Sequence, residues 1–386
     1  MVGVCIKYFH ENYGGMLQAY ATINMLESRG VNYELVQYQK KYSFYEKIKQ
    51  LPRLFNGILL NDKKEALIKR LGKKNHPEFA ANDAVRMSAF ERFKETHFTK
   101  LSQVFVGYKK LCEGASEYSA VISGSDQLWS PAGLPTNYYN LMFVPDQVRK
   151  ISIASSFGVK CIPWYQKSRT RAYLNRIDYI SMREDRGRDI VKELTGKTVP
   201  VILDPVFYFN EDEWKKLIPE KKEFQEPYIF AYFLGNNDDH RNAVKNVAKK
   251  LGKKIVALRH LDQYVECDET FGDYAPYDVG PDNFLNILRG ADYICTDSFH
   301  GSVFSIIHHK PFVVFNRYNE NSKHSKNSRI DSLCNNLGLG GQRFSTSARL
   351  YEQLMTTINY QDVEKKLNIL KQETNDYLDD ALNGIE

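Results

Sequence analysis

Short runs of consecutive apolar residues alternate along this 386-residue chain with longer segments in which apolar residues recur every three or four positions. The first pattern is typical of strands buried on both faces of a sheet, and the second of helices that pack by one face. Strands are therefore predicted at 2–9, 33–38, 119–122, 150–154, 178–181, 199–203, 228–234, 254–258, 293–295 and 312–315. Helices are predicted at 16–28, 82–97, 185–194, 239–251, 281–289, 303–309, 327–336 and about 347–382.

This order of strands and helices predicts an α/β protein. Strands joined through helices form parallel sheets, and the N-terminal strand, glycine turn, helix and strand make the first such unit. A chain of this length favours two domains. We predict two Rossmann-like domains, 1–205 and 206–386, that face each other across a cleft. A helical insertion at about 40–110 belongs to the first, and the long helical region closes the second.

The segment 40–74 interrupts the alternation and is strongly basic. It contains eleven Lys or Arg residues and only three acidic ones, and apolar residues recur through it at roughly helical spacing. A basic amphipathic segment of this kind can lie on an anionic membrane surface. It can equally be a helical insertion that packs on the domain and keeps its basic face in water. A peripheral membrane contact through 40–74 is thus one of two expected outcomes.

Composition excludes several classes of protein. The net charge of +6 is mild, and the chain lacks zinc-finger spacing and an RNA-recognition motif, so no nucleic-acid partner is expected. Its six cysteines are scattered without a CxxC pair, as is usual for free thiols in a reducing compartment. The N-terminus lacks a signal-peptide pattern, and no apolar stretch approaches the roughly 20 residues of a spanning helix. A cytoplasmic location is expected, with any membrane contact peripheral and at the inner face.

Polar residues gather where the predicted strands end, and in parallel sheets ligands bind beyond those carboxyl ends. The most informative stretch is 292–302, where a buried strand leads into a helix start that carries Ser298, His300 and Gly301. A helix start attracts anions, and a histidine there can contact an anion and carry a proton. The alternative is an ordinary strand-to-helix turn with a surface histidine.

The other strand ends contribute further candidates. The turn at 10–15 carries Gly14 and Gly15, whose backbone can approach a ligand closely or can simply make a turn. The polar side chains at the strand ends are Asn12, Gln18, Asp126, Gln127, Ser155, Arg183, Glu184, Asp297, Ser298, His300, Arg317 and Arg329. The chain has no GxSxG elbow, HExxH motif or cysteine–histidine cluster, so no metal is expected. Arginine and histidine at these positions suit a multiply charged anion.

Five short motifs, taken in order and spacing, resemble the polysaccharide pyruvyl transferase family over most of the chain. They are Asn12 to Tyr20, Gly124 to Trp129, Ser181 to Glu184, Asp204-Pro205 and Thr296 to Gly301. The resemblance implies a glycosyltransferase-B type fold. It also implies an enzyme that transfers the pyruvyl group of phosphoenolpyruvate to two hydroxyls of a sugar, giving a pyruvate ketal and phosphate, in capsule or exopolysaccharide biosynthesis. Phosphoenolpyruvate would be the donor substrate, and no cofactor is implied.

The resemblance further implies roles for single residues. Arg183 would bind phosphoenolpyruvate, and His300 would contact it and act as the acid that protonates its methylene carbon. Asp126 or Glu184 would serve as the base for the sugar hydroxyl. The chain departs from the family pattern at Ser298, where many relatives carry an arginine, so one expected cation is missing. The candidates to replace this cation are Arg317, Lys326 and Arg329.

The resemblance also implies a sugar acceptor, which we expect to be part of a lipid-linked oligosaccharide. The acceptor would bind on the side of 1–205 and the donor on the side of 206–386. Two alternatives stay open. One is a nucleotide-sugar glycosyltransferase with the same two-domain plan, and the other is a catalytically silent protein that binds a sugar or an anion, since a fold does not fix a function.

Overall fold

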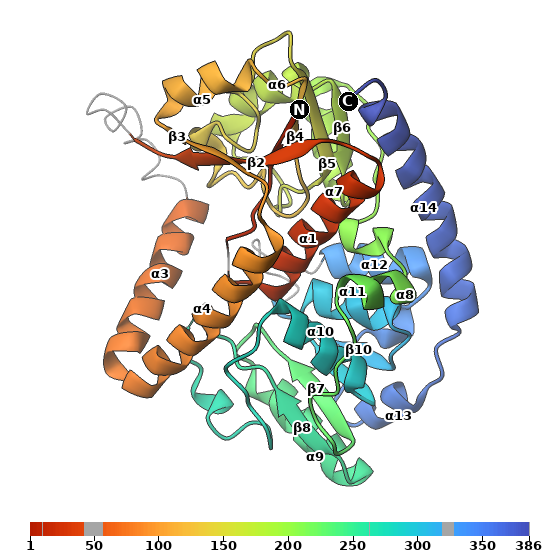
Figure 1. The fold of residues 1–386 in the computed structure, drawn as a ribbon. Coiled ribbons are helices and arrows are strands. Elements are labelled where there is room, and N and C mark those ends of the chain that lie inside the picture. The colour runs from red at the N-terminus through yellow and green to blue at the C-terminus, as the bar shows by residue number, and fades with distance from the viewer. Residues whose placement is uncertain (10, 42–56, 262, 319–327, 386) are drawn as a thin grey trace.

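The computed structural model describes residues 1–9, 11–41, 57–261, 263–318 and 328–385. Within them the chain forms two parallel β-sheets, one above the other in Figure 1, with helices around both. The first sheet has the strand order β3-β2-β1-β4-β5-β6, and the second has the order β10-β9-β7-β8. The predicted pair of Rossmann-like α/β folds is therefore confirmed.

The strands of both sheets are short and largely buried. Those of the first sheet are β1 (Val2–Cys5), β2 (Tyr33–Gln39), β3 (Leu101–Val106), β4 (Ala120–Ser123), β5 (Arg149–Ser155) and β6 (Tyr179–Met182). Those of the second are β7 (Tyr228–Tyr232), β8 (Lys254–Ala257), β9 (Tyr293–Thr296) and β10 (Phe312–Val314). Every residue of β1, β4, β7 and β10 is buried, because helices cover both faces of each sheet.

The helices connect successive strands and cover the sheets. They are α1 (Tyr13–Ser28), α3 (Gly57–Asn75), α4 (Pro77–His97), α5 (Tyr108–Ala115), α6 (Lys167–Arg176), α7 (Asp185–Thr195), α8 (Glu211–Leu217), α9 (Asp238–Leu251), α10 (Pro281–Gly290), α11 (Phe299–Ile307), α12 (Ser328–Leu337), α13 (Leu350–Met355) and α14 (Tyr360–Leu382). None of the helices in the described part of the chain is long and apolar enough to cross a membrane.

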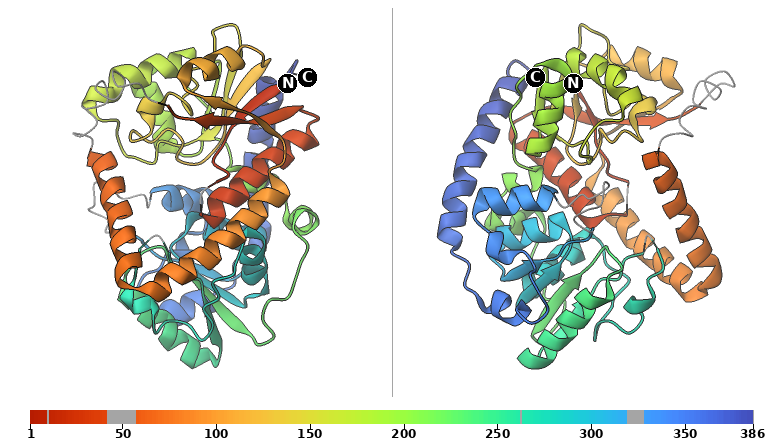
Figure 2. Two further views of the ribbon diagram at one scale, coloured as in Figure 1. Left: turned by 60° about the vertical axis from the view of Figure 1, so that its left-hand side comes forward. Right: turned by 180° about the vertical axis from the view of Figure 1, so that it is seen from behind.

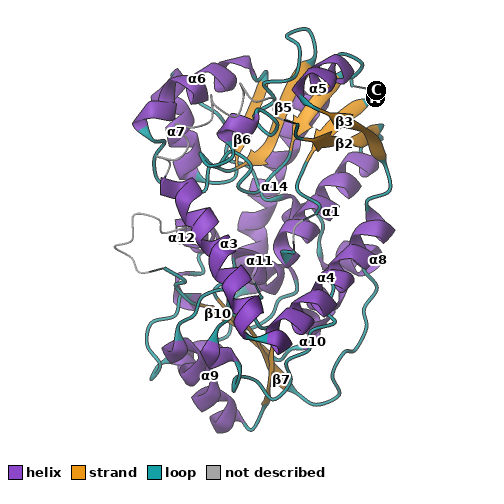
Figure 3. Ribbon diagram, turned by 90° about the vertical axis from the view of Figure 1, so that its left-hand side faces the viewer, coloured by secondary structure: helices purple, strands orange, loops and turns teal. Residues whose placement is uncertain are grey.

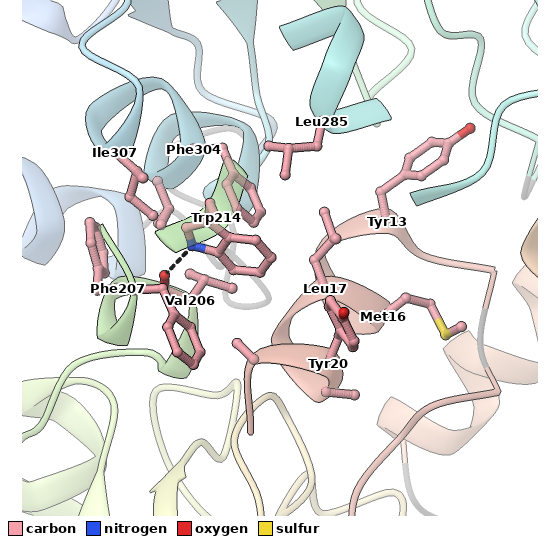
Figure 4. Packing of buried hydrophobic residues seen from close by; sticks show 14 of the residues in the cluster. Tyr13, Met16, Leu17, Tyr20, Val206, Phe207, Trp214, Leu285, Phe304 and Ile307 are labelled. Carbon is pink, nitrogen blue, oxygen red and sulfur yellow. Dashed lines mark hydrogen bonds between the residues drawn. The ribbon is translucent and has the colours of Figure 1, made fainter. Parts of the chain in front are cut away.

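Helix α1 lies between the two sheets and is buried along most of its length (Figure 1). Tyr13 in its first turn stacks on Phe284 of α10 with ring centroids 4.7 Å apart, and its hydroxyl donates to the carbonyl of Val279 at 3.1 Å. On the other side of α1, Trp214 of α8 packs edge-on against Phe304 of α11 (Figure 4). A single apolar core therefore joins both halves and fixes how their strand ends face each other.

The last helix, α14, runs back along the molecule from the second sheet to the first (Figure 2). Near its C-terminal end the hydroxyl of Tyr377 donates to the carbonyl of Ser152 in β5 at 2.7 Å. One turn earlier, Oγ1 of Thr374 accepts a hydrogen bond from the backbone N–H of Leu203 at 3.1 Å. The end of the chain thus packs on the first sheet, although its sequence follows the second.

Three of the sequence predictions for single elements differ from the structure. The predicted strand 199–203 forms only an isolated bridge between Val201 and Met182, because Pro200 and Pro205 supply no N–H for a ladder. The predicted helical insertion at 40–110 contains the edge strand β3, whose mostly exposed residues give no apolar run. The predicted helix 303–309 starts earlier, at Phe299, because Ser298 caps it by accepting from the N–H of Gly301 at 3.3 Å.

Candidate functional site

The candidate site forms where the carboxyl ends of β4 and β6 meet the start of α11. Arg183 follows β6 directly, Asp126 lies just beyond β4, and His300 is in the first turn of α11. Asp204, which caps the short 3-10 turn Pro205–Tyr208, contacts both Arg183 and His300. These four residues form the Arg183 cluster. They come from four of the sequence motifs and from both halves of the molecule.

Arg183 is the centre of this cluster, and its side chain is only 2% exposed. Its Nη1 donates to Oδ2 of Asp204 at 2.8 Å, and its Nη2 lies 3.5 Å from Oδ1 of Asp126. The guanidinium also lies over the ring of Phe299, 5.1 Å from the centroid. Its Nε and Nη2 find no hydrogen-bond partner among the described residues. Buried N–H groups nearly always have a partner, so these two are suited to a ligand.

Asp204 is the carboxylate that holds the cluster together. Its side chain is 1% exposed, and its Oδ2 lies 3.5 Å from Nε2 of His300. Its Oδ1 accepts from the backbone N–H of Val206, which fixes the carboxylate at the start of the turn. Burial raises the pKa of Asp204, but the charges of His300 and Arg183 and the hydrogen bond from Arg183 outweigh burial and lower the pKa to about 2. The carboxylate therefore stays ionised at neutral pH.

His300 is buried against the start of α1. A Cβ added to Gly14 would lie 2.1 Å from Nδ1 of His300, so the ring occupies the space that any other residue at 14 would fill. The start of α1 is held in place by Asn12, whose Oδ1 accepts from the N–H of Gly15 at 2.8 Å. The Nε2 of His300 has no hydrogen-bond partner within the described chain. The glycine turn thus allows the close approach of two helix starts.

Two carboxylates other than Asp204 lie beside Arg183. Asp126 has a left-handed backbone with φ of 73°, and its side chain is 24% exposed. Burial raises the pKa of Asp126, but the charges of Arg183 and Lys7 outweigh burial and hold the pKa well below its usual range. Glu184 is more buried, and its Oε1 accepts from the hydroxyl of Ser156 at 2.7 Å while its Oε2 has no hydrogen-bond partner in the part described.

A second arginine shares the ring of Phe299. The guanidinium of Arg329, in α12, lies 5.7 Å from the ring centroid. Burial and the charge of Arg183 lower the pKa of Arg329 to about 10. The two guanidinium groups are therefore close enough to repel each other. A bound anion would offset this repulsion, because an opposite charge nearby stabilises both cations.

A third arginine approaches from the end of β10. The Nε of Arg317 lies 3.7 Å from Oδ1 of Asp297, at the end of β9. Asp297 also accepts from the backbone N–H groups of Leu234 and Gly235, at 2.7 and 2.8 Å, and so joins the ends of β9 and β7. The Nε atoms of both Arg317 and Arg329 lack a hydrogen-bond partner within the described residues. The site can therefore offer several cationic N–H donors to one ligand.

Comparisons with known proteins place the chain in a family. A model of the polysaccharide pyruvyl transferase family matches residues 12–319, which include all strands of both sheets except β1. This chain belongs to the polysaccharide pyruvyl transferase family. None of the curated proteins searched matches it.

Solved structures of proteins with other names share the fold of this chain. A protein described as a UDP-N-acetylglucosamine 2-epimerase from Listeria monocytogenes is 10% identical, with a TM-score of 0.51 over 96% of this chain and 90% of that one. MnaA of S. aureus, solved together with UDP, is 11% identical, with a TM-score of 0.50 over 99% and 97% of the two chains. At this identity the likeness shows the fold alone, which is of the glycosyltransferase-B type.

The structure brings some of the predicted site residues of this family member together and places others in local structural contacts. Arg183, Asp126, Glu184 and His300 come together as described. Gln18 does not join them through a hydrogen bond, since its amide donates to Thr22 within α1 and the residue is buried. The remaining predicted residues have local structural contacts: Ser155 donates to the carbonyl of Gly124, the side chain of Gln127 lies against Gly158, Gly301 packs on Thr296, and Ser298 caps α11.

Two members of the site were missed at the sequence level. Asp204 was part of a motif but not a candidate, because its role depends on two residues far away in the sequence. Phe299 looked like an ordinary apolar residue, although its ring lies against two arginines. Lys326, a candidate for the missing cation, lies outside the described residues. Among those described, no group of three or more His, Cys, Asp or Glu residues could hold a metal ion.

The depressed pKa of Asp204 predicts a specific loss of stability in acid. The unfolded carboxyl takes up a proton near its ordinary pKa of 3.8, whereas the folded one resists until about pH 2. The stabilisation is therefore fully present above about pH 4 and is lost as the pH falls through 2, by roughly 2 kcal/mol. Urea unfolding of the wild type and of Asp204→Asn across this range should show their stability difference shrinking. A constant difference would contradict the assignment.

The contact between Gly14 and His300 predicts different effects at two adjacent glycines. Gly14→Ala places a methyl group on the imidazole and should destabilise the protein by about 3 kcal/mol, because neither helix start can move freely. Gly15→Ala is the matched control, since its nearest neighbour would be Oδ1 of Asn12 at an ordinary 3.4 Å. Denaturant unfolding should show the loss for Gly14→Ala only. Equal stabilities would mean that the two helix starts are not in contact.

Proposed function

We propose that this protein transfers the pyruvyl group of phosphoenolpyruvate to two hydroxyls of a sugar to form a pyruvate ketal, in the biosynthesis of a capsule or exopolysaccharide. The observation that carries the proposal is the set of buried side-chain nitrogens on Arg183, His300, Arg317 and Arg329 that lack a hydrogen-bond partner in the described part of the chain. Phosphoenolpyruvate presents a phosphate and a carboxylate, and arginine binds both groups through paired N–H donors. Family membership supplies the class of reaction, which is transfer of a pyruvyl group.

In this proposal Arg183 anchors the donor. Its Nε and Nη2 would donate to the phosphate or carboxylate, while Nη1 stays on Asp204. Arg329 would supply the cation that the family pattern places at position 298, since it lies on the same Phe299 ring as Arg183. Ser298 itself caps α11 and carries no positive charge, so the cation has to come from another residue. The α12 helix that carries Arg329 lies beyond the range that matches the family.

His300 is proposed as the acid. Protonation of the methylene carbon turns it into a methyl group and leaves the central carbon electron-poor. Two sugar hydroxyl oxygens then bond to that carbon, and its bond to the phosphate oxygen breaks. The two hydroxyl protons balance the step: one restores the proton on His300, and the other is taken up by the base and leaves with the phosphate. Positioned acid–base groups of this kind contribute about 100- to 10,000-fold to a rate.

Glu184 is the better candidate for the base that accepts a hydroxyl proton. The lowered pKa of Asp126 makes its carboxylate a weak base at neutral pH, and Arg183 lies beside it. Glu184 also lies beside Arg183, with its Oε2 3.9 Å from Nε, but this oxygen has no hydrogen-bond partner in the described chain. Asp126 would then position Arg183. The acceptor is proposed to be a sugar of a lipid-linked oligosaccharide.

The proposal is tested by the thermal stability of the purified protein with millimolar phosphoenolpyruvate, with UDP or without ligand. A ligand that binds only the folded state must raise the melting temperature. Phosphoenolpyruvate is expected to raise it and UDP is not. In Arg329→Met the rise in melting temperature with phosphoenolpyruvate should be smaller, corresponding to about tenfold weaker binding. The control is Arg349→Met, at an exposed position before α13, which should respond like the wild type.

The opposite pattern would redirect the assignment. A response to UDP without one to phosphoenolpyruvate would indicate a nucleotide-sugar glycosyltransferase. Binding of phosphoenolpyruvate without release of phosphate in the presence of any of a panel of saccharides would indicate a silent anion-binding protein.

A further inference from the structure

Helix α3 lies on the outside of the molecule (Figures 1 and 3). Its ion pairs show which face is turned inward. Lys69 lies 3.2 Å from both Oδ1 of Asp83, in α4, and Oε2 of Glu11. Lys73, one turn further on, also pairs with the buried carboxylate of Asp83. Residues at 69 and 73 share one side of a helix, so that side faces α4 and the start of α1.

The opposite side of α3 carries a row of exposed aliphatic side chains. Leu60, Leu67 and Leu71 lie at i, i+7 and i+11, which places them on one line along the helix. They are 47%, 54% and 48% exposed, and the neighbouring Ile68 is 39% exposed. Large apolar side chains are usually buried, so an exposed row of four on one helix indicates a contact surface.

Basic residues border this row on both sides. Lys63, Arg70 and Lys74 lie along one edge at helical spacing, and Lys64 lies along the other. All four are exposed. The acidic Glu65 projects about 140° away from the leucine line at 100° per residue, towards the inward side. The outer face of α3, defined by residues 60, 63, 64, 67, 68, 70, 71 and 74, thus combines aliphatic and positively charged groups.

We infer that the outer face of α3 docks on an anionic lipid membrane. Aliphatic side chains can enter the boundary between headgroups and acyl chains, while the flanking Lys and Arg residues contact negatively charged headgroups. A nucleic acid would match the positive charges but gives four aliphatic side chains no apolar phase. A second copy of this chain would bring two rows of positive charges together, which is unfavourable.

Docking through α3 would hold the candidate site close to the membrane. The Lys69 contact with Glu11 joins α3 to the segment immediately before Asn12, which caps α1. Gly14 of that helix start lies on His300. Membrane binding can be tested without donor or acceptor, so the inference stands independently of the proposed function.

The test is flotation of the purified full-length protein with lipid vesicles. One set of vesicles is phosphatidylcholine alone, and the other contains about one-third phosphatidylglycerol, a lipid with a negative headgroup. The wild type should float with the anionic vesicles only, and high salt should weaken this binding because it screens the charges.

Two pairs of variants separate the contributions of charge and apolar surface. Lys63→Gln with Lys64→Gln should weaken partitioning by about 30-fold, since each lysine near an anionic surface contributes about fivefold. Lys109→Gln with Lys110→Gln, an exposed pair on α5, makes the same change in net charge and should bind like the wild type. Leu67→Gln with Leu71→Gln should weaken binding at least about tenfold. Val85→Gln with Met87→Gln, on α4 and 43% and 42% exposed, is the matched control.

Several results would overturn the inference. One is that the wild type floats with neither set of vesicles. Another is that the α3 variants and their controls lose binding to the same extent. Binding that follows charge but ignores the two leucines would indicate a diffuse electrostatic attraction. A dimer in sedimentation that Leu67→Gln with Leu71→Gln dissociates would assign the face to a second copy of the chain.

Discussion

Replacing Arg183 with glutamine should abolish the response to phosphoenolpyruvate and destabilise the fold by about 3–5 kcal/mol. The destabilisation follows because the variant removes the cation that is hydrogen-bonded to the buried carboxylate of Asp204 and leaves His300, 3.5 Å away, beside it. The loss of binding follows because Arg183 supplies two N–H donors, Nε and Nη2, that have no hydrogen-bond partner among the described residues. The conservative Arg183→Lys keeps a charge but loses the forked geometry, so it should bind the donor more than about tenfold more weakly and stay better folded.

A second buried arginine separates these two effects. Arg241 in α9 is 1% exposed, and its Nε donates to Oδ1 of Asp268 at 2.6 Å. Arg241→Gln should therefore cost a similar amount of stability in urea unfolding, while phosphoenolpyruvate still raises its melting temperature. If Arg183→Gln kept the response, or if Arg241→Gln lost it equally, Arg183 would be a structural residue and not a ligand of the donor.

Replacing His300 with glutamine should lower kcat by about 100- to 10,000-fold and change the affinity for phosphoenolpyruvate much less. Glutamine fills similar space and can donate a hydrogen bond, but it cannot transfer a proton. The measurement is phosphate release from phosphoenolpyruvate in the presence of a saccharide panel, together with the melting-temperature response of the same variant.

A histidine just past the other end of α11 provides the control. His309 is 41% exposed and pairs with Glu364 at 2.9 Å. His309→Gln should leave both kcat and donor binding unchanged. A His300→Gln variant with normal turnover would rule out the acid role, and one that lost binding and turnover in proportion would make His300 an anion ligand alone. Deuterium from heavy water in the methyl group of the product would show directly that the proton comes from an exchangeable group.

The sequence by itself determined the architecture. Runs such as 120–123 and 228–232 contain too many consecutive apolar residues for a strand with one wet face, so sheets covered by helices on both sides were the expected outcome. The prediction of strands from the sequence failed where the run of apolar residues is missing or interrupted. Strand β3 lies at a sheet edge with most residues exposed, and the apolar run at 199–203 is interrupted by a proline that cannot join a ladder.

The sequence also predicted which motifs contribute residues to the candidate site. Strand ends and helix starts are recognisable from local residues, so Arg183, His300 and Asp126 were predicted together although they lie far apart in the chain. Local residues also signalled a basic amphipathic segment at 40–74. They could not decide between a membrane contact and a packed insertion, since that depends on which face of α3 the rest of the protein covers. Residues 42–56 of that segment lie outside the described residues.

Only the tertiary structure decided how these residues act on one another. The bridge from Arg183 through Asp204 to His300, and the contact of His300 with Gly14, join four separate elements. Their relative positions depend on α1 packing between the two sheets against α10 and α11, through contacts such as that between Tyr13 and Phe284. Local patterns specify single elements. Distances between elements follow from the shape of the whole core, and no single segment contains that information.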